Sequence, residues 1–214
     1  LAKKENIKVI LNGDGPDELF GGYNNYLRYF KTYQYFNLAN KAPKLIKYLA
    51  NKCVNKIKPG TPLSEITNRL YNNQDFYWPG AGGMKEGEKS SIISNDFKNI
   101  TNGFSSYNYV NQLKQEYNNF LSGNQFDYIN WLCFSGYKQA ITERFLFRAD
   151  RLGMANSIEV RVPFVSKKVI EFTNSLSIKE LLYKGILKSP LKDAFKTELT
   201  EEIINRPKHG FNVP

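Results

Sequence analysis

The stretch IKVILNGDGPDELFGGY, residues 7–23, contains the features that decide the fold. Its first five residues are mostly apolar and β-branched, which predicts a short buried strand that ends at Gly13. From Pro16 onward apolar residues recur at helical spacing as far as Phe30, and proline suits the first turn of a helix. A strand followed so closely by a helix would place backbone N–H groups at the strand's carboxyl end, where α/β proteins bind anions.

The loop between this strand and helix carries residues suited to nucleotide chemistry. Gly13 and Gly15 allow a ligand to approach the backbone closely. Asp14, Asp17 and Glu18 would repel a bare phosphate, so a metal ion or an ammonium group should stand between them. Magnesium-nucleotide chemistry with an amino-acid substrate fits this pattern. The alternative is an ordinary helix start, at which the helix dipole favours acids.

Composition predicts a soluble, cytoplasmic protein that has no membrane partner. Of 214 residues, 41% are hydrophobic and 14% aromatic, which is enough for a sizeable core. No stretch approaches the ~20 uninterrupted apolar residues of a spanning helix. Cys53 and Cys133 lack a paired CxxC pattern and are expected to be small core residues. His209, the single histidine, is not enough for a zinc site.

The net charge of +10 suits either a nucleic acid or a polyphosphate ligand. Much of the excess lies in residues 41–59, which also carry apolar residues near helical spacing: Leu45, Ile46, Leu49, Cys53 and Ile57. This pattern predicts an amphipathic helix that packs through its apolar side and leaves a basic face in solvent. RNA binding through the basic face is the alternative. Nucleic acid is not expected as a partner, because no aromatic platform or arginine cluster accompanies the lysines.

The rest of the chain is predicted to be mostly helical. Periodicity indicates helices near residues 43–57, 63–72, 84–93, 107–121, 125–148, 166–176 and 186–198. Polar, Asn-rich sequence at 95–106 indicates a loop. A single short strand cannot satisfy its backbone without neighbours, so its partners are expected in a missing N-terminal segment or in another chain.

Three stretches carry a family resemblance: LNGDGPDELFGGY at 11–23, RADRLGMANSIEVRVPF at 148–164, and LKSPLKDAF…LTEEIINRPKHGFNVP at 187–214. In this order they resemble the synthetase domain of glutamine-hydrolysing asparagine synthetase. The resemblance implies an α/β fold of the adenine nucleotide alpha hydrolase-like, ATP-pyrophosphatase type. Residues 1–214 would be the C-terminal portion of a single domain, mostly α-helical with one short N-terminal strand.

The resemblance also implies an activity. The carboxylate of aspartate would attack the α-phosphate of ATP, giving β-aspartyl-AMP and pyrophosphate, and ammonia made from glutamine would displace AMP. ATP and Mg²⁺ would be required, and a homodimer is left open. A related enzyme that amidates a sugar acid or cyclises a peptide is an alternative, as is a basic nucleic-acid-binding module.

Site residues follow from the resemblance position by position. Asp14 matches the acid that forms and resolves the adenylate, and Lys188 matches the lysine that meets pyrophosphate. Asp17 matches an acid near substrate and metal. Asn12, Gly13 and Gly15 would border the nucleotide.

Two further residues, Glu143 and Arg161, come from the later motifs. Glu143 is the acid in register with a second catalytic carboxylate, although ITERF at 141–145 stands where Leu-Pro-Asp-Asp is common. Arg161 is expected to form a buried ion pair with Glu159 that shapes the pocket, with direct ligand contact as the alternative.

The sequence departs from the family pattern in two more respects. Asn12 replaces the usual serine, so an amide takes the place of a hydroxyl. The family's Ser-Gly-Gly-x-Asp-Ser pyrophosphate loop and the glutaminase domain with its nucleophilic cysteine do not occur in the 214 residues. The chain alone is therefore predicted to be inactive.

Overall fold

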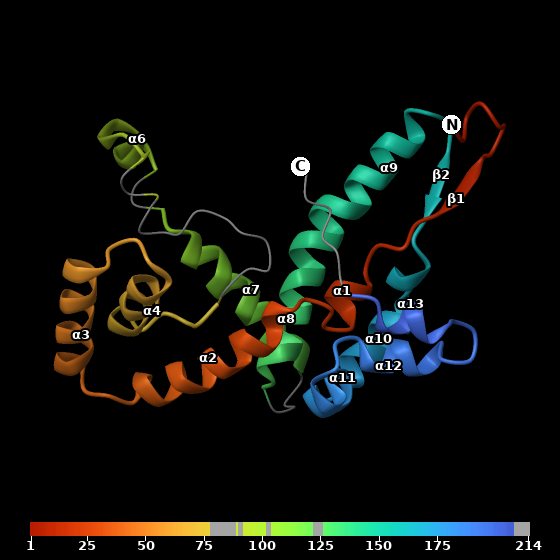
Figure 1. Ribbon diagram of the computed structural model, residues 1–214. Helices are drawn as coiled ribbons and strands as arrows, with labels where there is room; N and C mark the ends of the chain where they lie inside the picture. The colour runs from red at the N-terminus through yellow and green to blue at the C-terminus, as the bar shows by residue number, and fades with distance from the viewer. Residues whose placement is uncertain (78–88, 90–91, 102–103, 122–125, 208–214) are drawn as a thin grey trace. The chain divides into compact units, whose positions relative to one another are not determined.

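The computed structural model describes residues 1–77, 89, 92–101, 104–121 and 126–207, which are mostly helical. The chain forms two compact units (Figure 1): residues 1–23 with 137–214 form unit 1, and residues 24–136 form unit 2. No helix in the described ranges is both long enough and apolar enough to cross a bilayer.

Unit 1 contains a two-stranded parallel sheet. Strand β1, Val9–Leu11, pairs with β2, Glu159–Arg161, and Figure 1 shows the two arrows side by side. The Asn12 N–H continues the ladder by donating to the Arg161 carbonyl at 2.8 Å. The expectation of a single strand is wrong, because a distant segment supplies its partner. Burial was also expected and is not observed, since Leu11 is 74% exposed.

The helices of unit 1 pack around a small apolar core. They are α1 (Pro16–Leu19), the π-helical segment η1 (Tyr137–Leu146), α9 (Phe147–Met154), α10 (Lys167–Ser175), α11 (Ile178–Leu181), α12 (Ser189–Ala194) and α13 (Glu201–Asn205), with 3₁₀ turns η2 (Pro163–Val165) and η3 (Tyr183–Gly185). Leu19, Phe20 and Ile141 are buried at the centre of this core, and Val165 and Leu191 pack against them. The core therefore connects the loop after β1 with η1, η2 and α12.

Unit 2 is helical and rich in aromatic contacts. Its helices are α2 (Asn25–Asn40), α3 (Lys44–Ile57), α4 (Pro62–Tyr71), α6 (Asn95–Ile100), α7 (Ser106–Leu121) and α8 (Tyr128–Gly136). Tyr33 stacks on Tyr128 with ring centroids 4.0 Å apart, which holds α2 against α8. Tyr117 of α7 lies 5.5 Å from Trp131 and 5.2 Å from Phe134 of α8. These rings form the interior of the unit.

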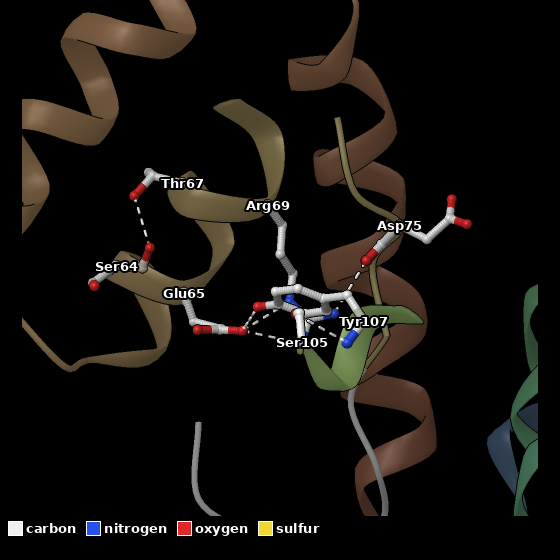
Figure 2. A network of polar contacts seen from close by, with 7 residues as sticks. All are labelled: Ser64, Glu65, Thr67, Arg69, Asp75, Ser105 and Tyr107. Carbon is white, nitrogen blue, oxygen red and sulfur yellow. Dashed lines mark hydrogen bonds and ion pairs between the residues drawn. The ribbon is translucent and has the colours of Figure 1, made fainter. Parts of the chain in front are cut away.

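A buried polar network joins α4 to α7 within unit 2 (Figure 2). Arg69 Nε donates to Glu65 Oε1 at 3.1 Å, and its Nη1 donates to the Asp75 carbonyl at 3.1 Å. The Tyr107 hydroxyl donates to the same Glu65 oxygen, and the Arg69 guanidinium lies 4.6 Å from the Tyr107 ring centroid. Glu65, Arg69 and Tyr107 are each less than 9% exposed, so each charge is compensated inside the protein.

Several local predictions need correction. The helix expected from Pro16 to Phe30 is broken after α1, because Gly21 adopts a left-handed conformation (φ 65°), and α2 begins at Asn25. The loop expected at 95–106 contains α6. The helix expected at 84–93 lies mostly outside the described residues. Cys133 is buried as predicted, but Cys53 is exposed.

Candidate functional site

The loop after β1 holds Asp14 in place through a local hydrogen-bonded turn. Asn12 Nδ2 donates to Asp14 Oδ2 at 2.6 Å, and the Asp14 N–H donates to Asn12 Oδ1 at 3.2 Å. This reciprocal pair is available to asparagine, since its side chain both donates and accepts. A methyl group added to Gly13 would meet no other part of the described chain within 4 Å, so the described residues leave space beside the Gly13 backbone.

Gly15 fixes how the chain turns from this loop into α1. Its φ is +110°, a conformation that side-chain-bearing residues rarely adopt, and an added Cβ would lie 2.8 Å from Val165 Cγ2. Pro16 then starts α1 at its preferred position. The turn and the packing against Val165 both require glycine at position 15. The presence of Gly15 is therefore explained without a bound ligand.

Lys188 and Asp17 form the ion pair of the site. Lys188 Nζ lies 2.7 Å from Asp17 Oδ1, with the two side chains 28% and 31% exposed. Lys188 sits at the start of α12 in a left-handed conformation (φ 56°, ψ 32°), which costs a non-glycine residue roughly 1–2 kcal/mol. Such strained residues cluster at functional positions. The sequence predicted that both side chains face one site.

Gly22 lets the chain pass directly against this ion pair. Its N–H donates to the Asp17 carbonyl at 2.8 Å, which closes the turn after α1. A Cβ at position 22 would lie 2.2 Å from Asp17 Oδ1 and 2.2 Å from Lys188 Cε. A side chain at this position is therefore excluded while the pair keeps its geometry.

A second interaction braces the same turn. Glu18 is 2% exposed, and the Tyr23 hydroxyl donates to its Oε1. Burial, and then this hydrogen bond to a carboxylate, raise the pKa of Tyr23 well above its usual range. The expectation that Glu18 faces a ligand together with Asp14 and Asp17 is wrong. In the structure Glu18 pairs with Tyr23 instead. The sequence signal that could have indicated this pair is their separation by five residues, with Gly21 and Gly22 between them allowing the chain to turn back.

Glu143 and Arg161 lie on other elements of unit 1. Glu143 is exposed on η1, and no hydrogen bond or ion pair in the described part of the chain joins it to Asp14 or Lys188. Arg161 Nε donates to Glu159 Oε1 at 2.8 Å, but the two side chains are 61% and 57% exposed. The predicted pair exists, and its predicted burial is wrong, because β2 has no further strand over it in the described residues. The hydrogen bond lowers the pKa of Glu159.

A metal site is not preformed in the described residues. No group of three or more His, Cys, Asp or Glu side chains gathers there in a metal-binding arrangement. Mg²⁺ in nucleotide enzymes takes one or two carboxylates and completes its shell with phosphate oxygens and water. Asp14 and Asp17 supply carboxylates of that kind, so the donor chemistry suits a cation that arrives with a nucleotide.

These features define a mostly helical chain with a short parallel sheet, whose first strand leads through the Asp14 loop into α1, where Asp17 pairs with Lys188. The model of the Asparagine synthase family matches residues 1–214. The chain belongs to this family.

Named relatives agree with the family match. The chain is 27% identical over 211 residues to "Asparagine synthetase [glutamine-hydrolyzing] 1" of Bacillus subtilis (strain 168), covering 99% of this chain and 31% of the relative. A putative asparagine synthetase of Mycobacterium bovis is 24% identical over 220 residues, covering 99% and 30%. A probable asparagine synthetase of Acanthamoeba polyphaga mimivirus is 39% identical over 77 residues, 34% of this chain and 14% of the relative.

The chain spans about a third of the length of the curated relatives that it matches from end to end. No solved structure shows a significant match.

Proposed function

We propose that this chain is part of an ATP-dependent enzyme that activates a carboxylate as an adenylate and converts it to an amide. Aspartate is the proposed substrate, with ammonia derived from glutamine, as the names of the relatives suggest. The observation that carries the proposal is the 2.7 Å contact between Lys188 and Asp17 beside the loop that holds Asp14. Residues 14, 17 and 188 were assigned linked roles from sequence, and this contact supports a shared site.

Lys188 is proposed to stabilise the departing pyrophosphate. Adenylate formation transfers negative charge to the leaving group, and a positioned cation lowers the barrier by ~3 kcal/mol when it is typical of such groups. The pair with Asp17 limits where the ammonium group can move, and the strained backbone at position 188 sets its direction from the start of α12. Positioning of this kind reduces the reorganisation needed during reaction.

Asp14 is proposed to accept a proton when ammonia is delivered as ammonium. Its carboxylate is oriented by the Asn12 side chain at 2.6 Å and lies next to the open space at Gly13. A base in this role must lie within hydrogen-bond reach of the attacking nitrogen.

Asp17 is proposed as the carboxylate that would hold Mg²⁺, which would offset phosphate charge on bound ATP. Glu143, Arg161 and Gly15 remain predicted site residues.

The test uses the longer gene product that contains these residues, with ATP, aspartate and either glutamine or ammonia. AMP and asparagine are measured, and Asp14→Ala and Lys188→Ala are each expected to abolish both with little loss of fold. Lys192→Ala, on the same short helix, is the matched control and should keep activity. Unchanged AMP formation in either site variant would contradict the proposal.

Two further outcomes define the substrate and the need for the family's pyrophosphate loop. Mass spectrometry of reactions with sugar acids or peptides identifies another carboxylate if aspartate is not turned over. The purified 214-residue chain is expected to make no asparagine from ATP, aspartate and ammonia. Asparagine formed under those conditions would show that the pyrophosphate loop of the family is dispensable here.

A further inference from the structure

Helix α3 packs against α4 through its polar side. Asn55 Nδ2 donates to Asn68 Oδ1 at 3.0 Å, and Ser64 Oγ donates to Asn55 Oδ1 at 2.7 Å. Thr67 Oγ1 donates to Asn51 Oδ1 at 3.4 Å, and Figure 1 shows the two helices side by side. Amide and hydroxyl groups, together with the Tyr48–Tyr71 ring contact at 5.7 Å between centroids, therefore form the contact between these helices, where an apolar seam was expected from the sequence.

The apolar residues of α3 lie on the opposite side and are exposed. This α3 apolar face consists of Leu45 (67% exposed), Ile46 (56%), Leu49 (51%), Ile57 (74%) and Cys53, which is also exposed. Four of these five follow one another at intervals of four residues, so they lie along one side of the helix. The predicted amphipathic helix is present, but the predicted packing of its apolar side is wrong for the described residues.

The segment that carries the α3 apolar face is rich in lysine and has no acid of its own. Residues 41–58 contain six lysines and no Asp or Glu. Lys52 and Lys56 each follow a leucine of the face, Leu45 and Leu49, by seven residues, which is close to two helical turns. They therefore border the apolar side chains, and their long apolar stems allow the charged groups to reach outward.

We propose that the α3 apolar face docks on the surface of an anionic phospholipid bilayer, with α3 lying in the plane of the headgroups. Aliphatic side chains on one side and lysines beside them are the signature of interfacial helices. The lysines contact headgroup phosphates while Leu45, Ile46, Leu49 and Ile57 enter the acyl boundary. Helix α3 has 14 residues and lies on the membrane without spanning it.

Charge selects this occupant over the alternatives. A second copy of the chain would bring lysine against lysine, because residues 41–58 contain no acid to complement them. A nucleic acid would satisfy the lysines but would leave the aliphatic side chains in water. The one aromatic side chain of α3, Tyr48, packs against Tyr71 of α4 and lies outside the α3 apolar face, so it offers no stacking surface there. The proposal departs from the expectation of no membrane partner, which rested on the lack of a spanning helix. It uses none of the residues assigned to amide formation.

Co-sedimentation of the 214-residue chain with vesicles tests the proposal. Binding is expected to vesicles of phosphatidylcholine with phosphatidylglycerol and not to vesicles of phosphatidylcholine alone. Ile46→Gln/Leu49→Gln should weaken binding roughly ten- to hundredfold, because two aliphatic side chains no longer enter the bilayer. Lys52→Glu/Lys56→Glu should weaken it at least about tenfold.

Matched variants control for lost apolar surface and for altered net charge. Phe97→Gln/Ile100→Gln removes two exposed apolar side chains from α6 of the same unit, 52% and 79% exposed. Lys168→Glu/Lys179→Glu changes the net charge equally at exposed positions of unit 1. Both controls should bind like the parent chain. Circular dichroism of every variant checks that the fold is kept.

Cys53 provides a readout located on the face itself. It is exposed and Cys133 is buried, so an environment-sensitive maleimide dye should label the native chain at position 53. Anionic vesicles are expected to shift its emission to the blue. The same dye on Ile100→Cys/Cys53→Ser, which carries its exposed thiol on α6 instead, should not respond.

Four results would overturn the proposal. The first is that the chain does not bind anionic vesicles, and the second is that the control variants lose as much vesicle binding as the variants of α3. The third is a dimer, detected by sedimentation, that Ile46→Gln/Leu49→Gln dissociates. The fourth is that the longer gene product does not bind vesicles and that its Cys53 is protected from the dye. The third result would assign the face to a second copy. The fourth would assign it to another part of the same protein.

Discussion

Replacing Gly22 with alanine should separate the catalytic role of the Asp17–Lys188 pair from its contribution to stability. The new Cβ would lie 2.2 Å from Lys188 Cε and 2.2 Å from Asp17 Oδ1, and 2.9 Å from the Asp17 Cα. The two side-chain ends can move, but the backbone atom cannot move cheaply. The substitution therefore displaces the ammonium group and the carboxylate from each other while most of the fold stays in place.

The size of each effect follows from these distances. Restoring an ordinary carbon contact of about 3.5 Å moves the end of Lys188 by about 1.3 Å. A misplacement of that order costs about a hundredfold in rate, or about 2.7 kcal/mol of barrier. The half-exposed ion pair itself contributes at most about 1 kcal/mol to stability, and local overpacking adds about 1–3 kcal/mol. Activity should fall far more than the folded fraction does.

The assay measures kcat for AMP release by the longer gene product and urea unfolding of the same variants. Gly153→Ala is the matched control, because its Cβ would lie 2.7 Å from the Ile158 carbonyl oxygen and 2.7 Å from Val160 Cγ2, away from the pair. It should lose similar stability and keep kcat at temperatures where it remains folded. If Gly22→Ala keeps full kcat, or if both variants lose kcat in proportion to stability, the positioning argument for Lys188 is refuted.

Two further predictions concern buried tyrosines and can be tested on the 214-residue chain. Tyr107→Phe leaves the Glu65 carboxylate without its hydroxyl donor and should lower the free energy of unfolding by about 1–3 kcal/mol in urea titrations. Tyr109→Phe on the same helix, 46% exposed, should change it by less than about 0.5 kcal/mol, and equal effects would contradict the network. Burial is the largest cause that raises the pKa of Tyr23, Tyr117 and Tyr128 above the ordinary value of 10.0. Since the folded state keeps these protons while the unfolded state loses them, the contribution of the three tyrosines to stability should be constant below about pH 10 and should be lost as the pH rises above it. Ionisation of all 14 tyrosines near pH 10 in a chain that remains folded would rule this out.

Much of the local structure could be predicted because its determinants lie within short segments. Helix α3 at Lys44–Ile57 and α7 at Ser106–Leu121 match the predicted ranges closely. Helical hydrogen bonds join residues four apart, so periodicity alone predicted α4 at 63–72, within one residue of its observed bounds, Pro62–Tyr71. The break after α1 was missed because the apolar spacing continued past Gly21, whereas the backbone conformation of that residue ends the helix.

The sequence by itself determined the family, the strand–loop–helix order around Asp14 and the amphipathic character of α3. Only the tertiary structure decided that β2 pairs with β1, that Lys188 meets Asp17, and which side of α3 is covered. The reason is distance along the chain. The β1–β2 pairing and the Lys188–Asp17 ion pair each join segments well over a hundred residues apart, and the pattern within either segment does not specify its partner. Burial likewise depends on which element packs against a helix. In α3 the neighbouring helix covers the polar side and leaves the apolar side exposed, which the amphipathic pattern alone does not reveal.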